Sequence, residues 1–130
     1  MILDTTVLHD LMYGKEDAIA SVSALEADDI PIKLSSMTVF ELYYGVGYTD
    51  KSDIERQKVE HVLRSIPIVP PDERIMRRAG TLDGKLECDG LKTGQSDLII
   101  GTTGVVLDEP VLTRNVSDFE RIPELRVETY

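Results

Sequence analysis

The stretch MILDTTVLHDLMYG, residues 1–14, determines how the rest of the chain is interpreted. Its first three residues are apolar and predict a short buried strand, which ends at Asp4. Either Thr5 or Thr6 then stands where the cap of a helix belongs, and Gly14 marks the end of that helix. The apolar residues between them recur at helical spacing: Val7, Leu8, Leu11 and Met12. A strand that leads directly into a helix is the beginning of a βαβ unit.

The same alternation of short apolar runs and longer helical segments continues along the chain. Further strands are predicted at residues 31–34, 66–69, 111–113 and 125–127. Further helices are predicted over residues 16–28 (with Ile19, Val22 and Leu25 at core spacing), from a cap at Ser35 or Ser36 to a taper at Gly45 and Gly47, over residues 53–64, from Asp72 to near Gly90, and from Ser96 onward. About five strands separated by helices predict an α/β fold: a mostly parallel sheet with helices on both faces, in three α/β/α layers.

Length and composition favour one domain that spans residues 1–130, since 130 residues suffice for one core and are too few for two. The N-terminal residues lack the pattern of a secretory signal, and no apolar run has the roughly 20 residues that a membrane span requires. We therefore expect a cytoplasmic protein without a membrane partner. Cys88 is the only cysteine, which excludes an internal disulfide and a zinc site of paired thiolates. His9 and His61 have no partner at ligand spacing, so histidine catalysis is not expected.

The formal net charge of −10 separates two classes of nucleic-acid protein. A protein that only binds nucleic acid is expected to be basic, because Lys and Arg neutralise the phosphates. A nuclease whose acidic residues hold a divalent cation does not need a basic total, because the metal supplies the local positive charge. The charge therefore argues against binding alone and leaves a metal-dependent nuclease open.

The positions of several polar residues relative to the predicted strands point to a functional site. Asp4 follows the first strand directly, Glu41 lies one to two turns into the helix after the second, and Asp97 lies in the first turn of a later helix. Asn115 and Asp118 both follow the strand at residues 111–113. Ligands of open parallel sheets bind at the carboxyl ends of the strands, so all of these side chains are able to meet at one rim.

Four segments in order resemble the motifs of the PIN domain, particularly of the VapC-type toxins. They are ILDTT at residues 2–6, SMTVFELYYG at 36–45, SDLII at 96–100 and LTRNVSDF at 112–119. The resemblance covers nearly the whole chain and implies a PIN-like fold and a magnesium- or manganese-dependent endoribonuclease. Such proteins are usually encoded with a small antitoxin that blocks them, so the resemblance also implies an RNA substrate and a cognate antitoxin as partners.

Carried over by position, the resemblance makes Asp4 the first acid, Glu41 the second and Asp97 the third. The fourth position falls on Asn115 or Asp118, and we favour Asp118 because an amide supplies no negative charge. The number of metal ions, one or two, stays open for the same reason. One departure from the family pattern is the run from Gly101 to Gly104, where an alanine-rich run is common; we expect it to lower helicity without touching the chemistry.

The chemistry of phosphodiester hydrolysis gives these residues their expected roles. The reaction needs an activated water and compensation for the charge that develops on the phosphoryl group, and Mg²⁺ or Mn²⁺ bound by carboxylates supplies both. Asp4 and Asp97 are expected as direct or water-bridged ligands, Glu41 as a ligand or as the group that positions the water, and Asp118 behind them. Thr6 and Thr113 are candidates to support the site through hydroxyl bonds, although capping or strand packing is the favoured role of both.

Three other functions share parts of this pattern. A PIN nuclease in housekeeping RNA maturation is the nearest, and the absence of an appended RNA-binding module argues mildly against it. A magnesium-binding phosphoacceptor receiver would need paired acids after the first strand, where this chain has Thr5 after Asp4, and a late lysine, where it has Arg114. A PIN domain that only binds is disfavoured by the presence of all three leading acids.

Two surface features have a functional and a structural interpretation. Arg74, Arg77 and Arg78 share one helical face, which Lys85, Lys92 and Arg114 extend in the sequence. They are either a track for RNA phosphates or, as we favour, a solvated face whose arginines pair with Asp72 and Glu73. A second group gathers around the end of the Glu41 helix: Tyr43, Tyr44, Val46 and Tyr48. This apolar surface predicts a homodimer interface or an antitoxin contact.

Overall fold

The computed structural model describes all 130 residues and contains five short parallel strands. They are β1 (Ile2–Leu3), β2 (Leu34–Ser35), β3 (Ile68–Val69), β4 (Val111–Leu112) and β5 (Val127–Glu128). One sheet has the order β1-β4-β5, and β2 and β3 form a second ladder. A parallel bridge between Ile2 and Lys33 joins the two, so the strands lie in the spatial order β3-β2-β1-β4-β5. The mostly parallel, roughly five-stranded sheet is confirmed, although most strands begin one to three residues later than predicted.

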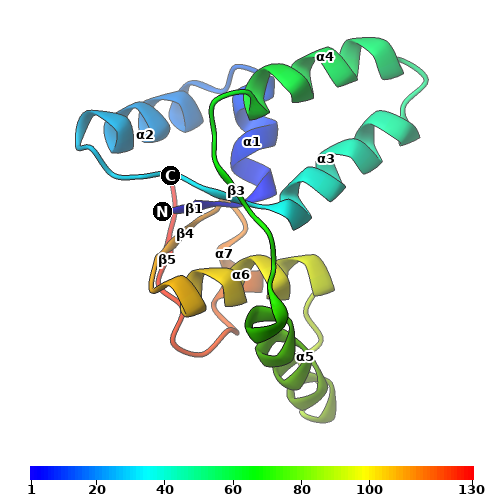
Figure 1. The fold of residues 1–130 in the computed structure, drawn as a ribbon, viewed down its shortest axis with the longest axis vertical. Helices are drawn as coiled ribbons and strands as arrows, with labels where there is room; N and C mark the ends of the chain where they lie inside the picture. The colour runs from blue at the N-terminus through cyan, green and yellow to red at the C-terminus, as the bar shows by residue number, and fades with distance from the viewer.

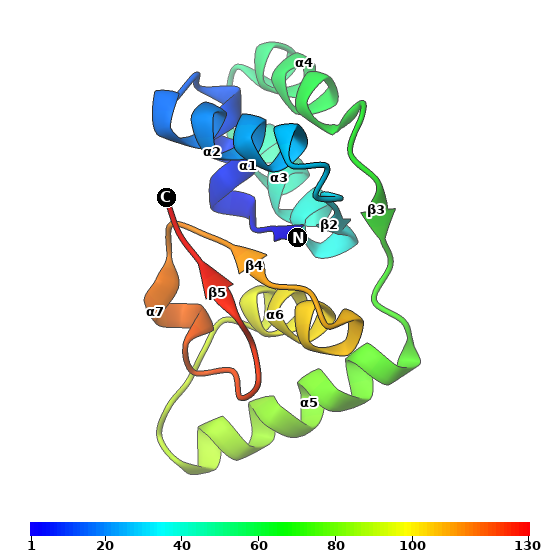
Figure 2. The same ribbon diagram turned by 90° about the vertical axis from the view of Figure 1, so that its left-hand side faces the viewer.

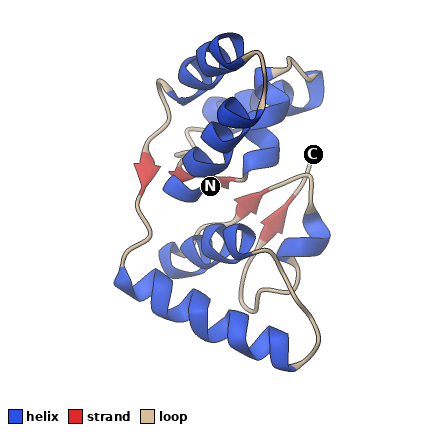
Figure 3. Ribbon diagram, turned by 90° about the vertical axis from the view of Figure 1, so that its right-hand side faces the viewer, coloured by secondary structure: helices blue, strands red, loops and turns tan.

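Helices cover both faces of this sheet, as predicted (Figures 1 and 3). On one side lie α1 (Thr5–Met12), α2 (Glu16–Ala27), α3 (Ser36–Tyr48) and α4 (Ser52–Leu63). On the other side lie α5 (Glu73–Cys88), α6 (Gln95–Leu107) and the short α7 (Val116–Phe119). The segment that carries β3 runs down one side of the molecule and connects the two layers (Figure 2). No helix of the structure has both the length and the apolar character that crossing a membrane requires.

The strands divide the apolar core into two clusters because successive side chains of a strand point to opposite faces. Leu3 and Leu112 join the cluster beneath α1 to α4, which also contains Leu34, Leu42 and Val59. Ile2 and Val111, their neighbours in sequence, join the cluster beneath α6 and α7. Phe119 of α7 is fully buried in this second cluster and anchors the segment after β4. The register that pairs β1 with β4 therefore determines which side chains enter the core on each face of the sheet.

Three sequence-based expectations about the helices are wrong. Ile19 is 44% exposed, because α2 buries Ala18 and Val22 instead. The helix that contains Glu41 does not taper at its glycines but continues through them to Tyr48. It ends there because the next residue, Thr49, has an extended backbone conformation. Val46 consequently faces the core and is buried, so it does not belong to the exposed aromatic surface with which the sequence grouped it.

Candidate active site

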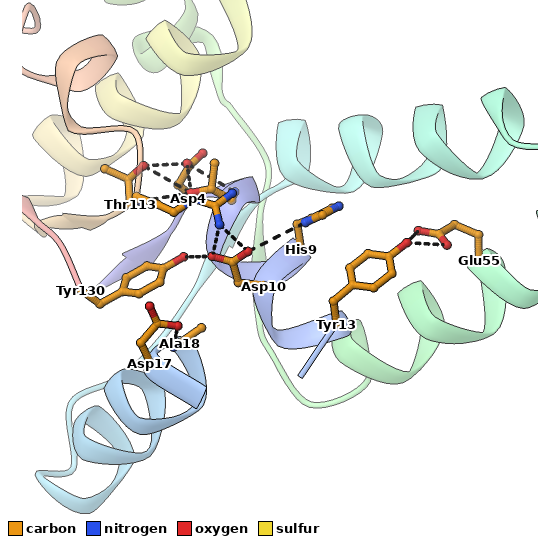
Figure 4. Close-up of polar contacts among 11 residues, drawn as sticks. Asp4, His9, Asp10, Tyr13, Asp17, Ala18, Glu55, Thr113 and Tyr130 are labelled. Atoms are coloured by element: carbon orange, nitrogen blue, oxygen red, sulfur yellow. Dashed lines mark hydrogen bonds and ion pairs between the residues drawn. The ribbon is translucent and has the colours of Figure 1, made fainter. Parts of the chain in front are cut away.

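Asp4 stands at the carboxyl end of β1 and is itself the N-cap of α1. Its Oδ2 accepts hydrogen bonds from the backbone N–H of Thr6 at 3.4 Å and from the Thr6 hydroxyl at 2.8 Å. The hydroxyl of Thr113, at the end of β4, donates to the same oxygen at 2.8 Å (Figure 4). The expectation that Thr5 or Thr6 caps this helix is therefore wrong. Thr6 and Thr113 support Asp4 through their hydroxyls rather than by capping or strand packing alone.

Glu41 reaches the same region from α3, whose N-cap is Ser35 as predicted. The Thr5 hydroxyl donates to Glu41 Oε1 at 2.7 Å, so the residue after Asp4 holds the second acid. Burial raises the pKa of Glu41, the hydrogen bond from Thr5 opposes that rise, and the negative charge of Asp4 adds to it. The carboxylates that the sequence placed at one rim thus interact electrostatically.

Asp97 lies in the first turn of α6 and has the most perturbed pKa of the predicted site. Burial is the largest cause, and the charges of Asp4, Glu41 and Asp118 follow in that order. Together they raise its pKa from 3.8 to about 7. Gly94 is the N-cap of this helix, and a Cβ atom there would lie only 3.3 Å from Asp97 Oδ2. This charge coupling brings all four predicted acids into one electrostatic environment.

The two candidates for the fourth position are bonded to each other. The Asn115 side-chain amide donates to Asp118 Oδ2, and the Asn115 backbone N–H donates to the Thr113 hydroxyl at 2.9 Å. Asp118 accepts no hydrogen bond from a backbone N–H, so it does not cap the turn in which it lies. Asn115 therefore links Asp118 to Thr113, which in turn holds Asp4.

An ion pair between a buried aspartate and an exposed arginine lies beside the site and was not predicted. Asp10 of α1 is 2% exposed, and Arg114 Nη1 lies 2.7 Å from both of its carboxylate oxygens. The Tyr130 hydroxyl donates to Asp10 Oδ2 at 2.8 Å (Figure 4), and this bond together with burial raises the pKa of Tyr130. The sequence held one signal for this pair: Asp10 follows Val7 by three residues and so lies on the buried side of α1, where an acid needs a partner. Arg114 is consequently committed to Asp10 and does not extend the row of arginines on α5.

The donor chemistry of the site fits a hard divalent cation. The four predicted acids all present carboxylate oxygens. The hydrogen bonds of Asp4 all use Oδ2, which leaves its Oδ1 without a donor. The acids do not form a group of three at direct-ligand spacing. Mg²⁺ usually keeps several waters and takes only one or two carboxylates from the protein, so this spacing suits it. Asp4, Asp97 and Glu41 are the residues that could hold such an ion.

Comparison with known proteins gives one family and one architecture. The family model of the PIN domain matches residues 1–125. The ribonuclease VapC2 of Rickettsia felis is 28% identical over 129 residues, which cover 99% of this chain and 96% of that protein. The tRNA(fMet)-specific endonuclease VapC of Salmonella typhimurium is 29% identical over 75% of this chain and 74% of its own. A crystal structure of VapBC2 from Rickettsia felis, bound to a promoter DNA fragment, superimposes with a TM-score of 0.89 at 26% identity, covering 99% and 97% of the two chains.

Proposed function

The chain belongs to the PIN-domain family, and on that premise we propose that it is a divalent-metal-dependent endoribonuclease, the toxin of a toxin–antitoxin pair. Support for the activity comes from relatives named as a ribonuclease and as a tRNA-specific endonuclease, which align along most of the chain. Support for an antitoxin partner comes from the similar VapBC complex. The proposal takes residues 1–130 as a single working domain.

One observation carries the assignment of the site: burial, and after it the charges of Asp4, Glu41 and Asp118, raise the pKa of Asp97 to about 7. Carboxylates that share a half-buried site repel one another, and a cation bound between them compensates that repulsion. Structural ion pairs do not explain the cluster, because none of these four acids takes part in a salt bridge. The ion is Mg²⁺ or Mn²⁺, which prefer oxygen ligands.

When bound, the ion supplies an acidic water and offsets charge on the phosphoryl oxygens. The residues of the chain do the rest. Thr6 and Thr113 fix the orientation of Asp4 by donating to one of its oxygens, and Thr5 does the same for Glu41. Asp4 and Asp97 are the proposed ligands. Glu41 binds the ion or orients the attacking water, and its raised pKa makes it a stronger proton acceptor than an ordinary glutamate.

Asp118 completes the proposed site from α7, which follows the carboxyl end of the neighbouring parallel strand β4. Its charge reaches Asp97, whereas the amide of Asn115 is engaged in holding Asp118. Asn115 is then a positioning residue, because it links the fourth acid to Thr113 and through it to Asp4. This division keeps Asp118 as the favoured fourth acid.

The partner surface that we propose is the exposed aromatic side of α3. Phe40 and Tyr44 are 64% and 65% exposed, and Tyr48 is 82% exposed. The rings of Tyr44 and Tyr48 stack with centroids 5.9 Å apart. Aromatic side chains gathered on one helix face are typical of interface cores. We assign this aromatic surface (Phe40, Tyr44 and Tyr48) to an antitoxin contact or to a homodimer interface.

The test of the function is cleavage of RNA by purified protein with Mg²⁺, compared with excess chelator. Wild type should cleave only with the metal, and Asp97→Asn should lose most of the rate while staying folded. Asp50→Asn is the matched control, since Asp50 is exposed, forms no salt bridge or side-chain hydrogen bond and lies outside the site. Cleavage in chelator, or an active Asp97→Asn protein, would contradict the proposal. Co-purification with the product of the neighbouring reading frame tests the toxin assignment.

A further inference from the structure

A cavity of about 590 Å³ lies between α5, α6 and the segment that leads into β5. Four basic side chains of α5 line it: Arg74, Arg77, Arg78 and Lys85. Thr102 of α6 and Pro123 form part of its other walls. In a chain of net charge −10 with 14 basic residues, four of those residues line this one cavity. The proposed nuclease chemistry does not use any of them.

The basic residues form a row rather than a single cluster. Arg74, Arg78 and Lys85 are spaced at i, i+4 and i+11, which places them along one face of α5. At a rise of 1.5 Å per residue, the row extends about 16 Å along the helix. That length exceeds what one small anion occupies, and it corresponds to several consecutive phosphates of a nucleic-acid strand.

Two of the four cations have no acidic partner in the protein. Arg77 pairs with Glu73 at 2.6 Å, and Arg78 pairs with Glu124. Both pairs are exposed and contribute little to stability, so they exchange readily for another anion. Arg74 and Lys85 are exposed and form no salt bridge. The sequence-based preference for a fully paired, solvated face therefore describes only half of this row.

The remaining walls of the cavity indicate how a ligand is held. No aromatic ring lines it, so bases have no platform on which to stack, and contact with the sugar–phosphate backbone is favoured. Thr102 is 1% exposed, and its hydroxyl has no hydrogen-bond partner in the protein. A phosphate oxygen that reaches the floor of the cavity would give this hydroxyl an acceptor.

We propose that this cavity, with its row Arg74, Arg77, Arg78 and Lys85, is an exosite that holds the phosphate backbone of the RNA substrate away from the cleavage site. The inference rests on the proposed ribonuclease function and adds where the rest of the strand lies. Thr102 follows Asp97 by five residues on α6, about 7.5 Å along the helix axis and about 140° around it, so a strand that occupies both sites passes around this helix. The row supplies the positive charge that the acidic chain otherwise lacks.

The test compares two double variants with equal loss of charge. Arg74→Gln with Lys85→Gln removes the unpaired cations of the row, while Lys15→Gln with Lys51→Gln removes two exposed, unpaired lysines far from it. Binding of a fluorescein-labelled single-stranded RNA of about 20 nucleotides is measured by anisotropy in the Asp97→Asn background, between about 50 and 200 mM salt. The row variant should bind RNA about tenfold more weakly. The slope of log K against log salt concentration (the salt slope) should be about 1.4 smaller for the row variant, whereas the control variant should keep the wild-type affinity and slope.

A kinetic measurement on the active enzyme separates the exosite from the reaction site. With long RNA the row variant should raise KM and keep kcat, and with a short oligonucleotide that spans only the reaction site it should match wild type. If wild type binds and cleaves RNA and the row variant shows the same binding and the same salt slope, the exosite proposal is overturned while the proposed function stands. The same holds if the variant loses binding to polyglutamate and not to RNA, since the cavity would then serve a protein partner. Failure of wild type to cleave RNA with Mg²⁺ instead contradicts the proposed function itself.

Discussion

Removing the charge of Asp97 should stabilise the metal-free protein even though it abolishes the proposed activity. In the folded state the pKa of this carboxyl is about 7, against 3.8 for the ordinary group, because it is partly buried and faces other carboxylates. A folded-state pKa above that of the unfolded chain means that ionisation opposes folding. The penalty is absent below about pH 4, grows between pH 4 and 7, and is complete above pH 7. Asp97→Asn keeps the size of the side chain and removes this penalty.

The magnitude follows from the size of the pKa change. A rise of about three corresponds to roughly 4 kcal/mol at about 1.36 kcal/mol for each tenfold change. Asp97 is only half-buried, so solvent screening reduces the effect, and about 1–2 kcal/mol is the expected gain above pH 7. For a domain of this length, that gain corresponds to a rise in Tm of about 3–8 °C.

Thermal melting followed by circular dichroism, in excess chelator at about pH 8 and about pH 4, measures the effect. Asp97→Asn should melt above wild type at the higher pH and close to it at the lower, while the Asp50→Asn control should match wild type at both. Adding Mg²⁺ should raise the Tm of wild type more than that of Asp97→Asn, because the ion binds the native state of wild type more tightly. A lower Tm for Asp97→Asn at pH 8, or a difference that does not change with pH, would show that the carboxylate is structural and refute this reasoning.

Four further outcomes are expected. Millimolar Mg²⁺ or Mn²⁺ should support RNA cleavage while Ca²⁺ binds, seen as a raised Tm, but supports little; equal rates with all three would contradict a site suited to Mg²⁺ or Mn²⁺. Asp118→Ala should reduce single-turnover cleavage about tenfold to a hundredfold and Asn115→Ala less, and the reverse order would move the fourth position to Asn115. Tyr44→Ser with Tyr48→Ser should weaken self-association or antitoxin binding in light scattering, and an unchanged mass and affinity would remove the aromatic surface from the interface. Gly104→Ala should cost about 1–3 kcal/mol in denaturant unfolding despite its gain in helix propensity, because a Cβ there would lie 2.8 Å from the Glu109 carbonyl oxygen; unchanged stability would mean that the chain shifts freely.

The order of elements and the grouping of the leading acids were predictable because both depend on local pattern. Short apolar runs between helical segments predict parallel strands, and the carboxyl ends of parallel strands share one edge. That rule predicts the position of Asp4, and the effect of its charge on the pKa of Asp97 is consistent with a shared edge. Strand limits were displaced because pairing partners, not the apolar run itself, decide which residues form the ladder.

The hydrogen bonds that hold the acids were not predictable in the same way. Thr113 and Asp4 are separated by 109 positions, and only the register of β1 against β4 brings the hydroxyl to the carboxylate. The bond between Arg114 and Asp10 likewise depends on the path of the chain after β4. A threonine near a strand end has a local role in capping or packing that single-sequence reasoning favours, and long-range register overrides it.

The glycines of α6 show how a feature that looks incidental in the sequence sets the position of the chemistry. The run from Gly101 to Gly104 was expected to weaken the helix without touching the site. In the structure a Cβ at Gly101 would overlap the end of the Ile122 side chain, and one at Gly104 would press on backbone as well as on Leu125. Because neither glycine has a Cβ atom, α6 lies close to the segment before β5. Because Asp97 begins this helix and Thr102 lines the basic cavity, one close packing contact positions both the acidic site and the proposed exosite, which helix propensity alone does not reveal.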